Sequence, residues 1–487
     1  MIKEEQLIEL VGPGNVSHDP ARLQEYSADM SFVDKVRPEY VVKVKNPESI
    51  QKLVLLARAT STPLVPVSSG PPHFRGDTVP SAGGSVIVDL SGMKKILWIN
   101  RENRVAMVEP GVTFAELIPA VAKAGLRLNM PLMPRKSKSV MGSMLEREPV
   151  IMPIYHWDVA DPLASTEVIF GTGDLFRTGS AAGPGTLEEQ RAAGGAQKEA
   201  AGPSSASWYR MIQGSQGTMG IVTWAATRCE ILPRREEPFF VGSSRLDNLL
   251  DTVHWLIRLR LVNECLILNS SDFATLMGGK EKPFSSLKSE LPAWILFFNV
   301  VAYDYLTEER LKGQMLDTQD LLQRLNMKTS RSLGGISVFA FLEVVRQPSA
   351  EPYWKLRRQG GCEDIFFITT YDKLAGIIEA MSAAAQSRGY PVSEMGIYLQ
   401  PIVQGVNCHC EFNLPYDPEN LQDSQRVKDL AASCIKPLMA RGAFFSRPYG
   451  EAARVVLEAD ASAVIALKKV KAILDPANIM NPGKLCF

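Results

Sequence analysis

The segment from Gly214 to Thr223 constrains the fold of this chain more than any other. Glycines stand at positions 214, 217 and 220, and Ile221, Val222 and Thr223 follow at once. Such β-branched residues favour a strand. Small residues at this spacing let the main chain approach a ligand closely before the strand begins. The segment therefore predicts a ligand-binding loop that leads directly into a strand.

Two further segments also contain small residues that could let the main chain approach a ligand. Residues 67–77 form a Gly/Pro-rich turn between the extended runs 63–67 and 85–90, and residues 139–143 contain small residues after a helix that we expect Thr113 to cap. A tight turn between strands can direct several main-chain N–H groups at one anion. Taken alone, a Gly/Pro-rich turn is more often only a turn. The three segments together indicate a diphosphate site.

The bulk composition is that of a folded protein with more than one domain. A chain of 487 residues corresponds to two or three domains. Its 53 Lys and Arg residues balance its 53 Asp and Glu residues, so no net positive field attracts nucleic acid or anionic lipid. The expected partner is a small molecule or another protein, not nucleic acid.

The sequence predicts a cytoplasmic location. Residues 1–10 lack the basic segment and apolar run of an export signal. The longest apolar stretch, 292–303, has about 12 residues, whereas a transmembrane segment needs about 20. The seven cysteines show no paired CxxC spacing, which favours reduced thiols over disulfides or zinc.

The expected elements divide the chain into three parts. Short strands and helices alternate up to residue 233, interrupted at 179–207 by a Gly, Ala, Ser and Pro-rich stretch that we expect to be a flexible surface insertion. From 234 to 430, longer helices separated by single extended runs predict a second α+β domain. Residues 431–487 supply further helices and end in Asn481, Pro482, Gly483 and Lys484.

The order of these motifs resembles the vanillyl-alcohol oxidase and p-cresol methylhydroxylase flavoprotein family, which also contains the D-lactate and glycolate dehydrogenases. The matching motifs are V-I-V-D-L-S at 86–91, V-E-P-G-V-T at 108–113, G-S-x-G-T-x-G-I-V-T at 214–223 and L-D-P-x-x-I-x-N-P-G-K at 474–484. The resemblance implies an α+β chain with a two-part FAD-binding domain of the vanillyl-alcohol oxidase type, built from 1–233 and 431–487. It also implies a central α+β cap domain, residues 234–430, over the flavin ring.

The same resemblance implies which residues bind FAD. The expected cofactor-binding residues are Ser68, Ser69, Gly70, Pro71, Pro72, His73, Phe74, Arg75, Gly76, Gly111, Val112, Ser139, Gly142, Gly214, Gly217, Gly220, Ile221, Val222, Asn481 and Lys484. Two departures stand out. Prolines and His73 occupy the middle of a turn that is usually richer in glycine, which removes N–H donors, and Gln216 replaces a common glutamate.

Non-covalent attachment of FAD is expected. Phenol-oxidising members attach the flavin from the segment that corresponds to residues 360–367, and here that segment contains neither His nor Tyr. His73 is the remaining histidine that could form such a bond, although it is offset by one place from the attaching residue of relatives.

The resemblance also implies catalytic residues. His409, Arg447 and Tyr449 are the candidates for a proton relay and for an anchor of the substrate oxygen or carboxylate. Strand alternation places Asn407, His409 and Glu411 on one face and the flanking cysteines on the other, which argues against a Cys-His-Cys metal site. No catalytic metal is expected, because Pro401 and the stretch 446–450 replace the metal ligands of the dehydrogenases.

Other readings stay open for these residues. His409 could be a structural histidine and Arg447 a surface arginine. The pair His156 and Trp157 looks like the phenol-oxidising branch, but Tyr155 stands where that branch has an acidic residue.

The predicted function is an FAD-dependent dehydrogenase that transfers hydride from a small 2-hydroxy acid or alcohol to flavin. The electrons would pass to a protein acceptor such as a cytochrome, an iron-sulfur protein or an electron-transfer flavoprotein. The alternatives are oxidation of a 4-alkylphenol or aromatic alcohol, and a flavin-binding electron-transfer subunit of a larger complex. A homo-oligomer or a subunit of a complex is expected.

Overall fold

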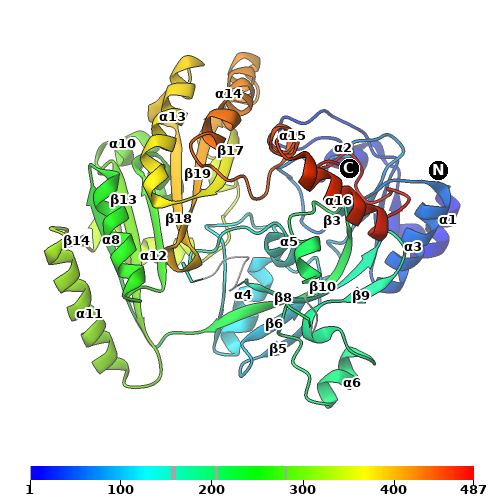
Figure 1. Cartoon of the computed structure of the whole chain (residues 1–487), viewed down its shortest axis with the longest axis horizontal. Coiled ribbons are helices and arrows are strands. Elements are labelled where there is room, and N and C mark those ends of the chain that lie inside the picture. Colours follow the sequence, from blue (N-terminus) through cyan, green and yellow to red (C-terminus); the bar gives the residue numbers. More distant parts are fainter. Residues whose placement is uncertain (1, 155–160, 203–206, 280–281) are drawn as a thin grey trace.

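A computed structural model describes residues 2–154, 161–202, 207–279 and 282–487. Figure 1 shows the N-terminal half and the red C-terminal helices together on one side, with the central part of the chain, green to orange, on the other. Among the described residues, no helix has the length and apolar character needed to cross a membrane.

The first sheet carries the turn 67–77. Its order is β1 (Val16–Ser17), β2 (Tyr40–Lys43), β4 (Val86–Asp89) and β3 (Leu64–Val67), with β2, β4 and β3 parallel. Parallel strands need a crossover connection, and α3 (Pro47–Thr60) supplies it between β2 and β3. The helices α1 (Glu4–Val11) and α2 (Pro20–Ser27) precede β2 in the chain. The turn thus leaves the C-terminal end of β3, at the edge of this sheet.

A second, mainly antiparallel sheet carries the other two glycine-containing segments. Its strands follow the order β5 (Ile96–Asn100), β6 (Val105–Val108), β10 (Gly220–Ile231), β8 (Leu163–Phe170) and β9 (Leu175–Arg177), and β7 (Leu126–Leu128) also pairs with β10. The connecting helices are α4 (Phe114–Lys123), α5 (Val140–Leu145), α6 (Leu187–Ala192) and α7 (Tyr209–Ile212). Part of the segment 179–207 is packed, since Gln197 is buried and its carbonyl accepts a hydrogen bond from Ser165.

The cap is one seven-stranded antiparallel sheet covered on both faces. The strand order is β14 (Thr329–Ser330), β11 (Arg235–Ser243), β13 (Trp294–Ala302), β12 (Glu264–Asn269), β18 (Gly396–Ile402), β19 (Asn407–Tyr416) and β17 (Gly361–Thr369). Alternate residues enter two cores: Phe298 packs with one set of helices and Phe297 with the other.

The helices of the cap are divided between these two cores. The larger core includes α8 (Leu246–Arg258), α11 (Thr307–Arg324), α13 (Leu374–Ser387) and α14 (Leu421–Met439), and the smaller one includes α9 (Ser270–Met277) and α12 (Val338–Val345). The remaining short elements are α10 (Phe284–Ser289), β15 (Ser332–Leu333) and β16 (Ile336–Ser337). Helix α14 crosses the predicted domain boundary at residue 430, and its buried face belongs to the cap core.

The C-terminal segment returns to the N-terminal half. After α15 (Gly450–Glu458) and α16 (Ala461–Leu474), Met480 forms a parallel bridge with Leu64 of β3. Lys471 of α16 is buried and donates to the Thr218 carbonyl at 2.5 Å and to Asp475 Oδ2 at 2.6 Å. Figure 1 shows α16, in red, beside β3 and the blue helices, so both chain ends build one unit.

Candidate active site

The turn 67–77 and the segment 139–143 lie side by side. The Gly70 amide donates to the Ser137 carbonyl at 3.1 Å, and the Ser139 amide donates to Ser69 Oγ at 3.0 Å. Ser139 then caps α5, because its Oγ accepts from the Gly142 amide at 2.9 Å. A Cβ atom on Gly142 would stand 3.0 Å from Ser68 Oγ, so the absence of a side chain permits this close approach.

Asn481 joins the third glycine-containing segment to the turn. Its Nδ2 atom donates to the Asp77 carbonyl at 2.8 Å and to the Gln216 carbonyl at 2.7 Å. Gln216 Nε2 in turn donates to the Pro448 carbonyl at 2.8 Å, which lies between the candidate residues Arg447 and Tyr449. Three segments and the C-terminal tail therefore converge on one region.

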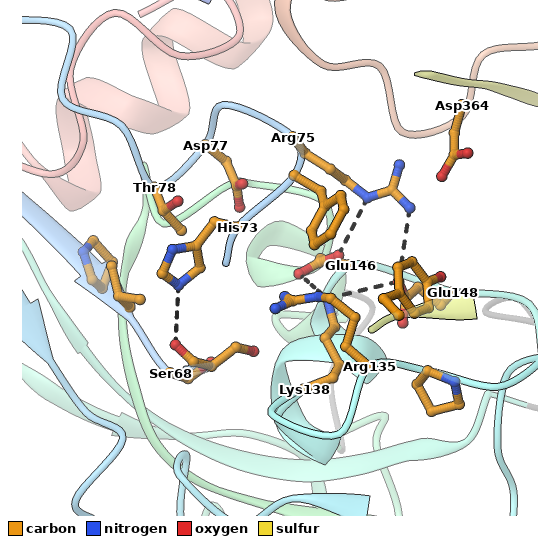
Figure 2. Close-up of a pocket in the computed structure, with 16 residues that line it drawn as sticks. Ser68, His73, Arg75, Asp77, Thr78, Arg135, Lys138, Glu146, Glu148 and Asp364 are labelled. Carbon is orange, nitrogen blue, oxygen red and sulfur yellow. Dashed lines mark hydrogen bonds and ion pairs between the residues drawn. The ribbon is translucent and has the colours of Figure 1, made fainter. Parts of the chain in front are cut away.

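The pocket at this region has a charged lining (Figure 2). Arg75, Arg135 and Lys138 contribute positive charge, and four carboxylates contribute negative charge. These carboxylates are Asp77, Glu146, Glu148 and Asp364. Asp364 comes from β17 of the cap, whereas the other groups come from the N-terminal half, so the pocket lies between the two parts of the chain.

Ion pairs connect most of these charges. Lys138 Nζ is 2.5 Å from Glu146 Oε1 and 3.7 Å from Glu148 Oε1, and Arg75 is 3.8 Å from both carboxylates. Burial alone would raise the pKa of Glu148, but the neighbouring Lys138 and Arg75 outweigh it and hold the pKa at about 2. Burial raises the pKa of Asp77 to about 6. The pocket wall thus combines Glu148, which stays ionised at neutral pH, with Asp77, which titrates near pH 6.

Phe366 of β17 is surrounded by the catalytic candidates. The Cζ atom of Arg447 lies 4.3 Å and that of Arg75 lies 4.4 Å from the centre of its ring. The rings of His409 and Tyr449 are each centred 6.3 Å from the same ring. His409, Arg447 and Tyr449, which are distant in sequence, are therefore brought together, although none of the three lines the pocket described above.

A buried network runs from His409 to the pocket wall. His409 Nε2 is 3.3 Å from Glu411 Oε2, Lys355 contacts Glu411 Oε1, and Lys355 Nζ is 2.7 Å from Asp364 Oδ2. Burial alone would raise the pKa of Glu411, but Lys355 and His409 hold it well below its usual range. Glu411 therefore stays ionised and fixes the orientation of the His409 ring.

Comparisons with known proteins decide the class of this chain. Residues 38–179 match the family described as "FAD binding domain", and residues 450–485 match "FAD linked oxidases, C-terminal domain". The glycolate oxidase subunit GlcD of Bacillus subtilis (strain 168) is 23% identical over 99% of this chain and 96% of its own length. The mitochondrial D-lactate dehydrogenase [cytochrome] of Arabidopsis thaliana is 22% identical over 92% of this chain and 73% of its own length.

The chain is an FAD-dependent oxidoreductase that carries the FAD-binding domain and the C-terminal domain of the FAD-linked oxidases. The crystal structure of p-cresol methylhydroxylase with substrate bound has the same fold, with a TM-score of 0.82 at 18% identity, over 99% of this chain and 96% of that one. The predicted fold class, an FAD domain with a cap, is confirmed.

The pocket of this FAD-linked oxidoreductase suits the anionic diphosphate of the cofactor. Within the described residues, the amides of His73, Phe74, Arg75 and Asp77 donate no hydrogen bond. Arg135 donates to the Gly70 carbonyl at 3.1 Å but forms no ion pair with any described carboxylate. Unpaired amides and an uncompensated guanidinium are donors that a diphosphate can satisfy.

The structure places the predicted cofactor residues in three kinds of position. Several of them line the pocket: Ser68, Ser69, His73, Phe74 and Arg75. Others make contacts through the main chain or a side chain that hold the loops together: Gly70, Pro71, Pro72, Gly76, Gly111, Val112, Ser139, Gly142, Gly214, Gly220 and Asn481. Gly217 lies against Pro66, where an added Cβ atom would stand 2.6 Å from the proline ring. Ile221 and Val222 are buried in the hydrophobic cores on β10, and Lys484 is half-buried near Asp77.

Residues that the sequence did not single out complete the site. Arg135 and Lys138 stand in a basic stretch immediately before the segment 139–143, and this pattern could have predicted that they bind an anion. No sequence pattern pointed to Lys355 or Phe366, because only the fold brings these residues close to His409. The pair His156 and Trp157, and Tyr155 beside it, lie outside the described residues. Among those described, no group of three or more His, Cys, Asp or Glu side chains is arranged to hold a metal.

Proposed function

We propose that this FAD-linked oxidoreductase oxidises the C–H bond of a small 2-hydroxy acid or alcohol. The observation that carries the proposal is a buried, hydrogen-bond-oriented histidine beside a buried arginine whose charge has no described partner. A base and an anion-binding group at one place are what a 2-hydroxy acid requires. FAD, bound without a covalent link, supplies the acceptor for the hydride.

His409 is suited to accept the proton of the substrate hydroxyl. Burial lowers the pKa of its imidazole, with Glu411 acting in the opposite direction, so the ring is neutral at pH 7. Its Nε2 faces the ionised Glu411 at 3.3 Å, which assigns the ring proton to Nε2 and leaves Nδ1 as the acceptor. As the substrate carbon gives up its hydride, the hydroxyl proton passes to His409 Nδ1, and both electrons leave with the hydride.

Arg447 and Tyr449 are suited to hold the other end of the substrate. Arg447 is 5% exposed, and its Nη1 atom and the Tyr449 hydroxyl are buried without a hydrogen-bond partner among the described residues. Leaving a buried donor unpaired costs about 1–3 kcal/mol, so an oxygen of the substrate gains by meeting both. A guanidinium also stabilises the ionised form of the substrate.

A 4-alkylphenol or aromatic alcohol is the second candidate substrate. Phe366 and Tyr449 place two aromatic rings beside Arg447, with their centres 6.3 Å apart, and an aromatic substrate could pack against them. A protein electron acceptor of the cytochrome class is proposed by analogy with the D-lactate dehydrogenase relative, whose name includes that partner.

Anaerobic addition of substrates to the purified holoenzyme tests the proposal. D-lactate, glycolate, 4-cresol and vanillyl alcohol are added separately, and the visible flavin band is followed. Bleaching by a 2-hydroxy acid supports the first candidate, and bleaching by 4-cresol or vanillyl alcohol alone supports the second. An unchanged band with all four compounds refutes both and favours an electron-transfer subunit.

A further inference from the structure

Lys355 is one step removed from His409 in a buried chain of hydrogen bonds. Glu411 lies between the two: its Oε2 atom is 3.3 Å from His409 Nε2, and its Oε1 atom contacts Lys355. Asn413 Nδ2 also donates to Glu411 Oε1, at 2.7 Å. All four residues are less than a tenth exposed. Because little water reaches them, neighbouring protein groups decide whether Glu411 is ionised.

Lys355 approaches Glu411 from outside the strand β19. It belongs to the short helical turn Trp354–Leu356, and its Nζ atom is also 2.7 Å from Asp364 Oδ2 on β17. Burial alone would lower the pKa of Lys355, but Asp364 and Glu411 raise it well above its ordinary value. Lys355 therefore keeps its positive charge and holds it beside Glu411.

The charge of Glu411 decides which nitrogen of His409 carries the ring proton. An ionised carboxylate only accepts hydrogen bonds, so it keeps the proton on Nε2 and leaves Nδ1 as an acceptor. A protonated carboxylic acid can donate to Nε2 instead, and the ring proton then belongs on Nδ1. In that second tautomer, His409 has no lone pair on Nδ1 with which to take a proton.

The other charged or titratable groups near Glu411 do not take the place of Lys355. They are His409 on the same strand, Asp364 of β17, Tyr398 of β18, Asp272 of α9 and Arg447 from the loop before α15. The two aspartates are acids themselves, and the Tyr398 hydroxyl donates to Gln400 Oε1 at 2.8 Å. Lys355 is the cation that contacts Glu411, and it opposes the effect of burial on the pKa of Glu411 more than any other group does.

We propose that Lys355 is a positioning residue that sets the tautomer of His409 through Glu411. Its charge keeps Glu411 ionised, Glu411 holds the ring proton on Nε2, and Nδ1 stays able to receive a proton. The value of this tautomer rests on the function proposed above, in which His409 accepts the proton of the substrate hydroxyl. The tautomer itself can be measured without any substrate.

The proposal predicts a pH dependence that a merely structural lysine would not produce. In the parent, the pKa of Glu411 lies well below its ordinary value, so the Nε2–H tautomer of His409 persists at neutral pH. In Lys355→Gln, that charge no longer opposes the burial of Glu411, and its pKa rises. The Nδ1–H tautomer should then appear at the lower pH values, where Glu411 is protonated, and the Nε2–H tautomer should return as the pH increases.

Nitrogen NMR of the histidine rings in the oxidised holoenzyme measures the tautomer directly. The chain has only five histidines, so labelling them gives few signals, and the signal lost in His409→Ala identifies His409. We expect the parent to show the Nε2–H form from about pH 5 to about pH 8. Lys355→Gln should show the Nδ1–H form towards the lower end of this range, and Lys355→Arg, which keeps the charge, should resemble the parent.

Lys471 provides a matched control for the loss of a buried lysine. It is 5% exposed, and its Nζ atom is 2.6 Å from Asp475 Oδ2 in the C-terminal segment. Lys471→Gln should leave the tautomer of His409 as it is in the parent. Circular dichroism and flavin content show whether each variant is folded, and the spectrum of the parent tests the proposal even if Lys355→Gln does not fold.

Stopped-flow reduction of the flavin adds a kinetic readout. D-lactate, glycolate and 4-cresol are each mixed anaerobically with the parent and with Lys355→Gln. At the lower pH values the variant should be reduced at least about tenfold more slowly than the parent by the substrate that reduces the parent. The ratio of the two rates should approach one as the pH rises and the Nε2–H tautomer returns.

The outcomes separate an error in this proposal from an error in the proposed function. The Nδ1–H form in the parent, or the parent's tautomer at every pH in folded Lys355→Gln, overturns the role of Lys355. A Lys355→Arg variant that loses the Nε2–H form as fully as Lys355→Gln also overturns it. A change of tautomer in Lys355→Gln that leaves flavin reduction unaffected supports the control of the tautomer by Lys355 and refutes His409 as the base.

Discussion

Replacing Lys355 by methionine should destabilise the cap in a pH-dependent manner. Lys355 Nζ is 2.7 Å from Asp364 Oδ2 and contacts Glu411, and all three side chains are largely buried. Removing one partner of a buried ion pair leaves an uncompensated charge and costs about 3–5 kcal/mol. For a domain of about 200 residues, this loss lowers Tm by roughly 6–20 °C.

The direction of the pH dependence follows from Glu411. In the parent its pKa is held well below the usual 4.5, so Glu411 contributes stability above about pH 4.5 that is lost as the pH falls. In Lys355→Met the strongest of the groups that lower the pKa of Glu411 is gone, so this pKa rises and the ionised carboxylate contributes less stability than in the parent. The difference in Tm between parent and variant should grow from pH 4.5 to pH 8.

Differential scanning calorimetry across this pH range measures the effect. The control is the double variant Lys355→Met with Glu411→Gln, which removes one buried carboxylate along with the lysine and should be less destabilised at pH 8 than the single variant. A loss of Tm in Lys355→Met that is the same at every pH would refute the ion-pair argument. So would a double variant whose loss of Tm equals the sum of the losses in the two single variants.

Three further predictions address the cofactor, the base and a buried acid. Acid precipitation should release FAD into the supernatant, because β17 (Gly361–Thr369) offers no His or Tyr for a covalent bond, and flavin in the pellet would instead implicate His73. His409→Ala should keep the flavin spectrum but slow substrate-driven reduction by at least about tenfold in stopped-flow measurements, or about 1.4 kcal/mol. Burial raises the pKa of Asp272 to about 8, so the contribution of this residue to stability falls as the pH rises from about 4 to about 8. Asp272→Asn should therefore raise Tm by an amount that increases over that range. A difference in Tm that stays constant with pH would contradict this prediction.

Much of the secondary structure was predictable because local signals agree with the final packing. The helix that Thr113 was expected to cap begins at Phe114, and the extended runs expected at 63–67 and 85–90 are the strands β3 (Leu64–Val67) and β4 (Val86–Asp89). On β19, Cys408 and Cys410 enter the large core while His409 and Glu411 occupy the other face, as strand alternation predicted. These features depend on near neighbours in the sequence.

The details of the site depended on contacts between distant residues. The sequence indicated that Gly217 lets the main chain approach a ligand, yet a Cβ atom there would meet Pro66 at 2.6 Å, with φ at +74°. A substitution at this position would therefore strain the loop as well as disturb the cofactor. No local pattern could show that Lys355 pairs with Glu411, or that Arg75 reaches the ring of Phe366, because the residues of each pair are far apart in the sequence.

We propose that a substrate C–H bond breaks next to His409 as its hydride passes to FAD. Anaerobic stopped-flow spectroscopy with D-lactate and with D-lactate deuterated at the hydroxyl-bearing carbon tests this directly in a single turnover. We expect the flavin band to bleach and deuterium to slow the bleaching, because the bond to that carbon is broken in the step observed. A flavin that D-lactate and glycolate leave fully oxidised would contradict it.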